Sequence, residues 1–293
     1  MSRWIAVDWG TTALRAVLME GDRAVEARAS GDGMGGLDPQ GFEPALRALT
    51  EGWREGPTDV VVCGMAGARQ GWREAPYRPV PCAPVGADAV QVPTDDPDLR
   101  VRIVAGLSQA APHPDVMRGE ETQIAGLLAG EPGLDGCTCL PGTHTKWVHV
   151  SAGEVVSFRT VMTGEVFALL SRHSVLRHSL GEDGWDDAAF DAAVSDGLAR
   201  PQALTARLFQ LRAADLLEGQ APAVARATLS GLLVGVELAA TRPWWLGRDV
   251  VVCGADRTVA PYLRALGAQG VRARAVDART ATLAGLARAR AAA

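Results

Sequence analysis

WIAVDWGTT, residues 4–12, is the stretch from which the fold is predicted. Its apolar run, residues 5–7, is β-branched at two of three positions and so indicates a buried strand. Asp8 stands at the end of this strand, and a second strand-like run covers residues 13–19. The small and hydroxyl residues of a turn lie between the two runs: Gly10, Thr11 and Thr12. The stretch therefore predicts a strand–turn–strand unit with a carboxylate at its first strand end.

The turn of this unit has the groups that a magnesium–nucleotide complex requires. Asp8 can hold hydrated Mg²⁺, since this ion keeps most of its waters and takes one or two carboxylates plus phosphate oxygens. The glycine at position 10 allows backbone N–H groups to approach phosphate, and the two threonine hydroxyls add donors. An ordinary hairpin with Asp and Gly in its turn would contain the same residues, so the stretch alone leaves both interpretations open.

A second strand–turn–strand unit follows in CTCLPGTHTKWVHV, residues 137–150. A short strand again runs into a Gly-Thr-x-Thr turn, and a second strand follows it. The turn offers backbone, hydroxyl and cationic groups to phosphate oxygens; they belong to Gly142, Thr143, His144, Thr145 and Lys146. We expect the backbone and threonine contacts to dominate, because a structural histidine and a solvated lysine would explain the two basic residues equally well. The repetition favours a nucleotide site over two unrelated hairpins.

A glycine-rich segment, GMAGARQGW at residues 64–72, leaves the predicted buried strand 58–63. In an open α/β sheet, ligands bind beyond the carboxyl ends of the strands. Arg69 could form a forked pair with the carboxylate of a sugar acid, while Gln70 and Trp72 offer an amide and a stacking face. A glycine-rich turn with a surface arginine is the alternative interpretation.

Two segments combine carboxylates with a predicted helix start. RGEETQ, residues 118–123, opens a helix predicted over residues 124–129. The helix dipole favours Glu120 and Glu121 there, and one of them could accept the proton of an attacking substrate hydroxyl; we favour Glu121. MTGE, residues 162–165, starts a helix predicted to reach residue 180, with Thr163 as its N-cap. Three residues in or just before this segment could line a substrate site: Arg159, Thr163 and Glu165.

Six motifs together resemble the 2-dehydro-3-deoxygalactonokinases (2-keto-3-deoxygalactonate kinases), a family of the sugar kinase, Hsp70 and actin superfamily. They occur in the expected order over nearly the whole chain: DWGTT, GMAGARQGW, RGEETQ, LPGTHTKW, MTGE and VVCGAD. The resemblance implies two α/β domains of the actin-like ATPase (ribonuclease H-like) type with a nucleotide cleft between them. It also implies that Gly254 and Ala255 of the last motif lie against the purine of ATP.

The resemblance implies an enzyme that phosphorylates 2-dehydro-3-deoxy-D-galactonate at its 6-hydroxyl in galactonate catabolism, with ATP and Mg²⁺. A similar Glu pair precedes the second phosphate loop in the exopolyphosphatase branch of the superfamily, so a phosphohydrolase is one alternative. A kinase for a different sugar acid is another, because spacing does not report the stereochemistry of the substrate. A non-enzymatic ATP-dependent switch would need a partner-binding domain for which the two lobes leave no room.

The chain of 293 residues predicts two domains of about 150 residues each. The turn signal at residues 130–133 suggests an N-terminal, sugar-acid domain over 1–131 and a C-terminal, nucleotide domain over 132–293. Helical periodicity over residues 186–217 predicts an insertion in the second domain. Gly231 and Gly235, in the long helix predicted next, would let another element approach closely.

Composition limits the partners and the compartment. The net charge of −5 argues against a basic nucleic-acid face. The sequence has no run of about 18 apolar residues and no signal-peptide pattern, so we expect a cytoplasmic protein without a membrane span. The five cysteines have no metal-ligand spacing and are expected to be reduced core residues. The helical insertion could also serve a homodimer.

Overall fold

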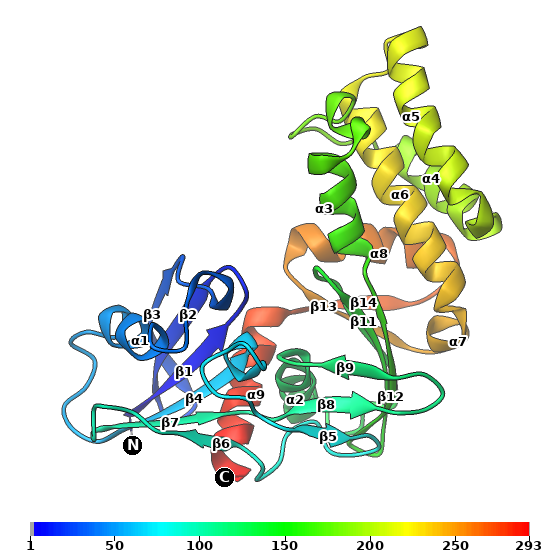
Figure 1. Ribbon diagram of the computed structural model, residues 1–293. Helices are drawn as coiled ribbons and strands as arrows, with labels where there is room; N and C mark the ends of the chain where they lie inside the picture. Colours follow the sequence, from blue (N-terminus) through cyan, green and yellow to red (C-terminus); the bar gives the residue numbers. More distant parts are fainter. Residues whose placement is uncertain (1–2, 293) are drawn as a thin grey trace. The chain divides into compact units, whose positions relative to one another are not determined.

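The computed structural model describes residues 3–292, which form two compact units. Unit 1 comprises the chain up to residue 135, residues 150–157 and the chain from residue 278, whereas unit 2 comprises residues 136–149 and 158–277. The prediction of two continuous domains with a boundary at 131/132 therefore differs from the structure. The chain first passes from unit 1 to unit 2 after residue 135. Residues 150–157 and the chain from residue 278 belong to unit 1 again. Figure 1 shows the elements of both units.

Unit 1 is built on a six-stranded sheet in the order β3-β2-β1-β4-β7-β6. Its strands are β1 (Arg3–Trp9), β2 (Leu14–Glu20), β3 (Arg23–Ser30), β4 (Thr58–Gly64), β6 (Val90–Val92) and β7 (Leu99–Ile103). The first two form an antiparallel hairpin, while β1, β4 and β7 run parallel. A second, small sheet has the order β5-β8-β9 and consists of β5 (Tyr77–Pro79), β8 (Gly106–Gln109) and β9 (Asp115–Met117). Residues 77–101 thus contain two short strands, β5 and β6, and the start of β7.

The predicted buried strand β1 is confirmed, and its two faces belong to two apolar cores. Ile5 and Val7 pack with α1 (Phe42–Leu49), whereas Trp4 and Ala6 pack with α9 (Ala278–Ala292). This alternation has the period of two that a strand imposes on its side chains. Since the helix nearest the C-terminus completes the second core, it belongs to unit 1 although it follows all of unit 2 in sequence.

Glycines explain how closely α9 packs against α2 (Glu120–Gly130). A Cβ atom at Gly126 would lie 1.8 Å from the carbonyl oxygen of Ala281, and one at Gly285 would lie 1.8 Å from that of Thr122. Each helix therefore offers a glycine to the backbone of the other. The helix start at Glu120, four residues earlier than predicted, is part of this packed element.

Unit 2 repeats the sheet of unit 1, with the strand order β12-β11-β10-β13-β14. Its strands are β10 (Gly136–Leu140), β11 (Thr145–Ser151), β12 (Glu154–Val161), β13 (Val250–Gly254) and β14 (Ala273–Asp277). In both units a hairpin leads into a parallel pair formed by the first strand and the fourth. The repeated strand–turn–strand pattern of the sequence thus corresponds to a repeated sheet.

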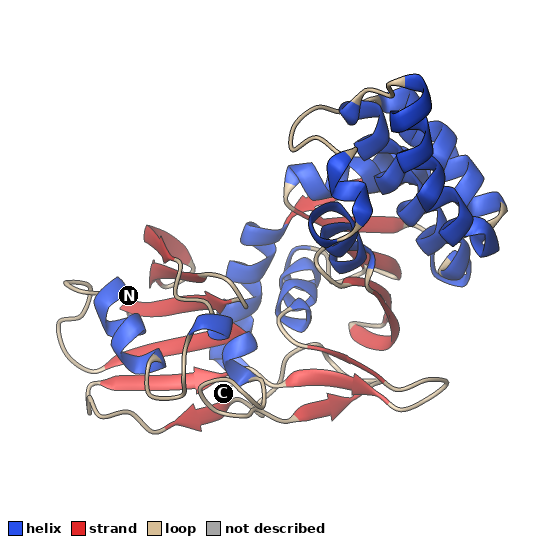
Figure 2. Cartoon of the chain, turned by 45° about the horizontal axis from the view of Figure 1, so that its top comes forward, coloured by secondary structure: helices blue, strands red, loops and turns tan. Residues whose placement is uncertain are grey.

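The helical part of unit 2, drawn in Figure 2, contains the predicted insertion and the helices predicted on either side of it. It consists of α3 (Thr163–His173), α4 (Asp187–Ala199), α5 (Leu204–Glu218) and α6 (Pro222–Ala240), followed by the short α7 (Arg242–Trp245). The helix predicted to reach residue 180 ends at His173, where a 3-10 turn follows. A Cβ at Gly231 or Gly235 would lie 2.4 Å from a carbonyl oxygen of α4, so the close approach predicted for these glycines is confirmed.

The helix α6 is the one element of residues 3–292 whose length and apolar composition match a membrane span. More than half of it is buried against other elements, which is typical of a core helix.

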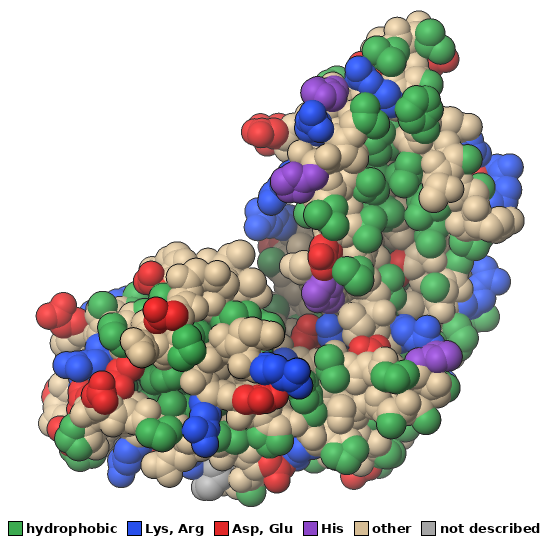
Figure 3. Space-filling model, in the orientation of Figure 1, with side chains coloured by type: hydrophobic (Ala, Val, Ile, Leu, Met, Phe, Trp, Pro, Cys, Tyr) green, Lys and Arg blue, Asp and Glu red, His purple; other side chains and the backbone are tan. Residues whose placement is uncertain are grey.

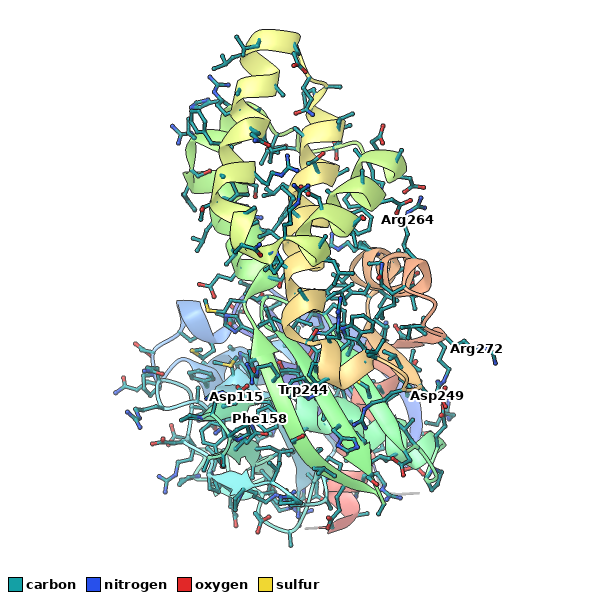
Figure 4. All side chains as sticks on the ribbon, turned by 90° about the vertical axis from the view of Figure 1, so that its right-hand side faces the viewer. Asp115, Phe158, Trp244, Asp249, Arg264 and Arg272 are labelled. Atoms are coloured by element: carbon teal, nitrogen blue, oxygen red, sulfur yellow. The ribbon has the colours of Figure 1, made fainter. Side chains whose placement is uncertain are left out.

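Ion pairs connect α8 (Asp256–Ala268) with the helical part of unit 2. Arg264 of α8 pairs with Asp187 and Asp191 of α4 at 2.8 and 2.6 Å. Arg264 is labelled in Figure 4.

Candidate active site

The turn between β1 and β2, formed by Gly10, Thr11 and Thr12, is called the first turn below. A loop at residues 31–36 supports it from behind through the backbone. The Met34 N–H donates to the carbonyl of Gly10 at 3.0 Å, and the Gly35 N–H donates to that of Thr11 at 2.9 Å. Both threonine side chains are exposed, so their hydroxyl groups are accessible to a ligand. The first turn is thus held in one conformation with its outer side open.

A glycine makes this support possible. A Cβ atom at Gly33 would lie 2.3 Å from the carbonyl carbon of Thr12, which is far inside van der Waals contact. Trp9, at the end of β1, is fully buried and donates from its indole N–H to the carbonyl of Asp32 at 2.8 Å. The loop at residues 31–36 is therefore the structural partner of the first turn.

Asp8 lies next to the last residue of β1, with a side chain that is partly exposed. Its Oδ2 accepts a hydrogen bond from Arg15 of β2 at 3.2 Å. Burial raises the pKa of Asp8, Arg15 opposes this shift, and the charge of Glu120 adds to it. A carboxylate whose pKa is raised by the charge of a neighbouring carboxylate fits a divalent cation, because a bound cation would favour its ionised form.

The two glutamates at the start of α2 differ in exposure. Glu121 is fully buried; its Oε2 accepts from the N–H of Gly119 at 2.7 Å and its Oε1 from the hydroxyl of Thr122 at 3.0 Å. Burial, together with the charge of Glu120, raises the pKa of Glu121 to about 7. Glu120 is only half-buried, and its Oε2 accepts from the N–H of Arg118 at 3.1 Å. Glu121 therefore caps the helix, and Glu120 is the more accessible carboxylate.

The start of α2 lies beside the carboxyl end of β4 because two glycines adopt positive φ angles. Gly64 has φ +90° and Gly119 has φ +108°, and a Cβ at Gly119 would lie 3.4 Å from the Cα of Gly64. A Cβ at Gly64 would in turn lie 2.7 Å from the carbonyl oxygen of Trp9. The ends of β1 and β4 and the start of α2 thus converge on one edge of the sheet.

The side chains after Gly64 follow the prediction only in part. Arg69 and Gln70 are exposed beyond the strand ends, and the Arg69 side chain, 82% exposed, lies 3.7 Å from Glu74. Trp72 was expected to offer a stacking face to a ligand. Its ring instead stacks on Phe42 at 6.0 Å and meets Trp9 edge-on at 5.7 Å, because the glycine-rich segment folds back onto the core of unit 1.

The turn between β10 and β11, residues 141–144, is called the second turn below; of its predicted phosphate ligands, Gly142, Thr143 and His144 are exposed. The N-terminus of α3 supports it. The Glu165 N–H donates to the carbonyl of Thr143 at 2.9 Å, and a Cβ at Gly164 would lie 2.1 Å from the carbonyl oxygen of Gly142. The His144 ring bonds the carboxylate of Glu165.

Three predicted ligands near the second turn are engaged elsewhere. Thr145 is fully buried, and its hydroxyl lies 3.0 Å from that of Tyr262, while Lys146 is 4% exposed rather than solvated. Thr163 is not the N-cap of α3: Met162 occupies that position, and the Thr163 hydroxyl donates to Glu237. Thr145 and Thr163 therefore bond other residues of unit 2, and Lys146 is buried.

A buried carboxylate that sequence reasoning missed connects these residues. Glu237 of α6 is 1% exposed and accepts from the indole N–H of Trp147 at 2.7 Å, from the hydroxyl of Tyr262 at 2.9 Å and from the hydroxyl of Thr163. Burial raises the pKa of Glu237 to about 7, and its three donors oppose the shift. A glutamate within the apolar sequence of this helix was the available signal.

The predicted purine-side motif lies at the end of β13. A Cβ at Gly254 would lie 3.7 Å from the Cδ of Pro141 in the second turn, and Ala255 is the exposed N-cap of α8.

The predicted substrate residue Arg159 of β12 lies over the ring of Trp244 at 5.3 Å, which makes it a stacked surface residue of unit 2. Trp244 is labelled in Figure 4.

No cluster of three or more His, Cys, Asp or Glu residues that could hold a metal ion occurs among residues 3–292. This is compatible with magnesium, which needs only one or two protein carboxylates when phosphate oxygens and water complete its shell. The residues that fit this role are Asp8 and Glu120. The five cysteines are free, and four of them are buried, as the sequence predicts.

Comparison with known proteins gives matches over nearly the whole chain. A sequence model of the 2-keto-3-deoxy-galactonokinase family matches residues 8–289. "Probable 2-dehydro-3-deoxygalactonokinase DgoK1" of Rhizobium meliloti (strain 1021) is 41% identical over 292 residues, with 97% of this chain and 95% of the relative covered. "2-dehydro-3-deoxygalactonokinase" of Escherichia coli (strain K12) is 37% identical over 290 residues, with 97% and 96% covered.

A solved structure is similar as well. The crystal structure of a "putative 2-dehydro-3-deoxygalactonokinase protein" from Sinorhizobium meliloti has a TM-score of 0.92 at 40% identity and covers 99% of this chain and 98% of that one. A far more distant sugar kinase, at 11% identity, shares the fold alone. The actin-like ATPase fold that the motifs implied is therefore confirmed.

Proposed function

Since the chain belongs to the 2-keto-3-deoxy-galactonokinase family, we propose that it phosphorylates 2-dehydro-3-deoxy-D-galactonate at its 6-hydroxyl, with ATP as phosphoryl donor. The observation that carries the proposal is that the strand end with Asp8 and the helix start with Glu120 meet at one edge of the sheet, beside the open first turn. A phosphoryl transfer needs a site for the metal that accompanies the phosphates and a carboxylate that can accept the hydroxyl proton. This edge of the sheet contains both.

In the proposed reaction, the 6-hydroxyl oxygen attacks the γ-phosphorus and the bond between the γ-phosphorus and the bridging oxygen breaks, which releases ADP. Glu120 accepts the proton of the hydroxyl. Asp8 would hold Mg²⁺, which would supply positive charge to the phosphate oxygens. The first turn in unit 1 and the second turn in unit 2 each offer backbone N–H groups and threonine hydroxyls that suit phosphate oxygens. Because these donors are already fixed by their supporting loops, they need no reorganisation.

Glu120 is a better base than Glu121, which the sequence favoured, because a base must come within hydrogen-bond reach of the proton it accepts. The half-exposed carboxylate of Glu120 supports this choice. Glu121 is fully buried with both oxygens bonded at its own helix start. We therefore assign Glu121 the role of holding the helix start, and through it Glu120.

The sugar acid would be bound by exposed polar groups of both predicted sets. Arg69 and Gln70 support binding of the substrate carboxylate in unit 1, because they are exposed beyond the strand ends. In unit 2, Arg159 and Glu165 are partly exposed. The stacked guanidinium of Arg159 keeps its hydrogen-bonding edge available, as is usual for an arginine that lies over an aromatic face.

A cytoplasmic location and a homodimer belong to the same proposal. The relatives are named as metabolic kinases of a sugar acid. Hydrophobic side chains gather over the helical part of unit 2 in Figure 3, and three of the exposed ones belong to α5: Phe209, Leu216 and Leu217. Such residues are compatible with contact to a second copy.

The test of the substrate is ADP release from Mg-ATP, measured with the galactonate-derived acid, with its gluconate epimer and with neither. We expect release that depends on the galactonate-derived acid. Equal or faster release with the epimer would favour the kinase for a different sugar acid. Release that is indifferent to both acids would favour the exopolyphosphatase-like hydrolase, in which water takes the place of the sugar hydroxyl.

A further inference from the structure

The buried carboxylate of Glu237 is bonded to residues from three elements other than its own helix α6. The donors are Trp147 of β11, Thr163 of α3 and Tyr262 of α8. A buried charge is costly unless it is fully hydrogen-bonded, so all three contacts contribute to keeping the carboxylate in place. In return, the carboxylate fixes the position of each donor. Glu237 therefore sets how β11, α3 and α8 meet behind the second turn.

The contact to Tyr262 extends to the second turn itself. The Tyr262 hydroxyl donates to Glu237 at 2.9 Å, so its remaining capacity is that of an acceptor. Thr145, at 3.0 Å, consequently donates to it. Thr145 is the first residue of β11 and directly follows the second turn. A chain of two hydrogen bonds thus fixes the downstream end of the turn to Glu237.

The contact to Thr163 reaches the same turn from its other side. Thr163 is the first residue of α3, and the next two residues form the support of the turn. Gly164 lies against the carbonyl of Gly142, and the Glu165 N–H donates to the carbonyl of Thr143. One carboxylate therefore fixes both the strand that follows the second turn and the helix start that lies against it.

We propose that Glu237 is a positioning residue for nucleotide binding: it holds the second turn in the conformation that receives the phosphates of ATP. The inference rests on the proposed function and deepens it. Glu237 does not contact substrate, because it is 1% exposed and its carboxylate is surrounded by its three donors. It acts only through Thr145 and through the start of α3.

Two variants test the inference. Tyr262→Phe removes the hydroxyl that links Glu237 to Thr145 and keeps the aromatic ring. Glu237→Gln keeps the shape of the side chain but replaces one acceptor oxygen by an N–H₂ group that faces donors. Thr241→Val is the matched control, because Thr241 is equally buried at the end of α6 and its hydroxyl bonds the backbone carbonyl of residue 237, not the carboxylate.

The measurements are the dissociation constant of Mg-ADP by titration calorimetry and the separate KM values for ATP and for the sugar acid. We expect about tenfold weaker Mg-ADP binding and a similar increase of KM for ATP in Tyr262→Phe and Glu237→Gln, with KM for the sugar acid within about twofold. Thr241→Val should bind Mg-ADP like the wild type. A structural role alone would lower the unfolding temperature of all three and leave these constants unchanged.

Unchanged Mg-ADP affinity in folded Tyr262→Phe would overturn the inference, and this variant decides the matter if Glu237→Gln does not fold. A parallel increase of both KM values would also overturn it, since the effect would then not be specific to the nucleotide. Failure of the proposed function has a different signature: the wild type would bind Mg-ADP, and the variants would bind it more weakly, although no sugar acid is phosphorylated.

Discussion

The first and second turns occupy equivalent positions in two sheets of the same strand order, yet they carry charge in different ways. The first turn follows Asp8, a partly exposed carboxylate at the end of β1. The corresponding strand β10 ends at Leu140, which is buried. The support of the second turn contains two carboxylates: Glu165, which bonds the His144 ring, and Glu237, which is buried behind the turn. A repeated fold therefore does not imply a repeated charge pattern: one turn follows a partly exposed carboxylate at its strand end, and the other is held by a buried one.

The two turns agree in how the backbone supports them. Each is contacted from behind by a glycine whose Cβ would collide with the turn, Gly33 in unit 1 and Gly164 in unit 2. Each also receives backbone N–H donors from its supporting segment. The conformation of both turns is thus set by other parts of the chain, which is the condition for donors that need no reorganisation when a phosphate binds.

The largest effect should come from the carboxylate that only the first turn possesses. Asp8→Asn keeps the side-chain shape but removes the charge proposed to hold the metal, so we expect kcat to fall by about three orders of magnitude. Thr143→Ala in the second turn should change KM for ATP only several-fold, because backbone donors remain. Unfolding by circular dichroism checks that both variants are folded. Normal turnover of Asp8→Asn would contradict the role of Asp8.

The glutamate pair gives the next largest effect and separates a base from a capping residue. Glu120→Gln should lower kcat by about two orders of magnitude, the usual contribution of general base catalysis. Glu121→Gln should lower kcat far less, because the buried side chain would act only by holding the helix start. Steady-state kinetics of both variants provide the measurement. The reverse order of the two effects would assign the base to Glu121.

The supporting glycines should be equivalent in the two units. Gly33→Ala and Gly164→Ala each force a methyl group against the backbone of a turn, so we expect a loss of about 1–3 kcal/mol in the free energy of unfolding. The controls are Gly36→Ala and Gly267→Ala, where a Cβ would meet nothing within 4 Å. Urea denaturation compares the four variants. Wild-type stability of either turn variant would show that its turn can shift freely.

The last prediction concerns pH, because each unit buries one glutamate among the residues that the structure describes. Burial raises the pKa values of Glu121 and Glu237 to about 7, against about 4.3 for an unfolded glutamate. The folded state therefore retains protons that the unfolded chain has lost, so the free energy of unfolding decreases as the pH rises from about 4.5 to 7 and levels off above that.

Each glutamate contributes at most about 1.4 kcal/mol per pH unit within this window. Glu237→Gln should remove the contribution of unit 2, and Glu121→Gln that of unit 1, in denaturation series from pH 5 to 8. A pH dependence that stays unchanged in both variants would mean that the two groups titrate alike in the folded and unfolded states.

Sequence patterns predicted the parts of the fold that follow from local periodicity and turns. The apolar run of β1, the repeat of the hairpin and the two glycines of α6 were all recognised. The return of α9 to unit 1 was not, because its partner Gly126 lies more than 150 residues away in sequence and helix periodicity does not report a distant partner.

For the candidate site, too, sequence patterns predicted the local backbone better than the contacts of side chains. Exposed backbone and hydroxyl groups of the turns lie where the motifs predicted them, since a Gly-Thr turn between two strands leaves few alternatives. Side-chain direction was the weak point. Trp72, Thr145 and Thr163 belong to recognised motifs, but their side chains point to Phe42, Tyr262 and Glu237. Such contacts depend on residues elsewhere in the chain, which spacing alone does not identify.

The most direct test of the account is ³¹P nuclear magnetic resonance of one reaction mixture that contains the protein, Mg-ATP and 2-dehydro-3-deoxygalactonate. The account predicts that the γ-phosphate signal is replaced by ADP and an equal amount of a phosphomonoester coupled to the protons on carbon 6 of the acid. Inorganic phosphate in place of the phosphomonoester would contradict it, because the acceptor would then be water and Glu120 would serve a hydrolase.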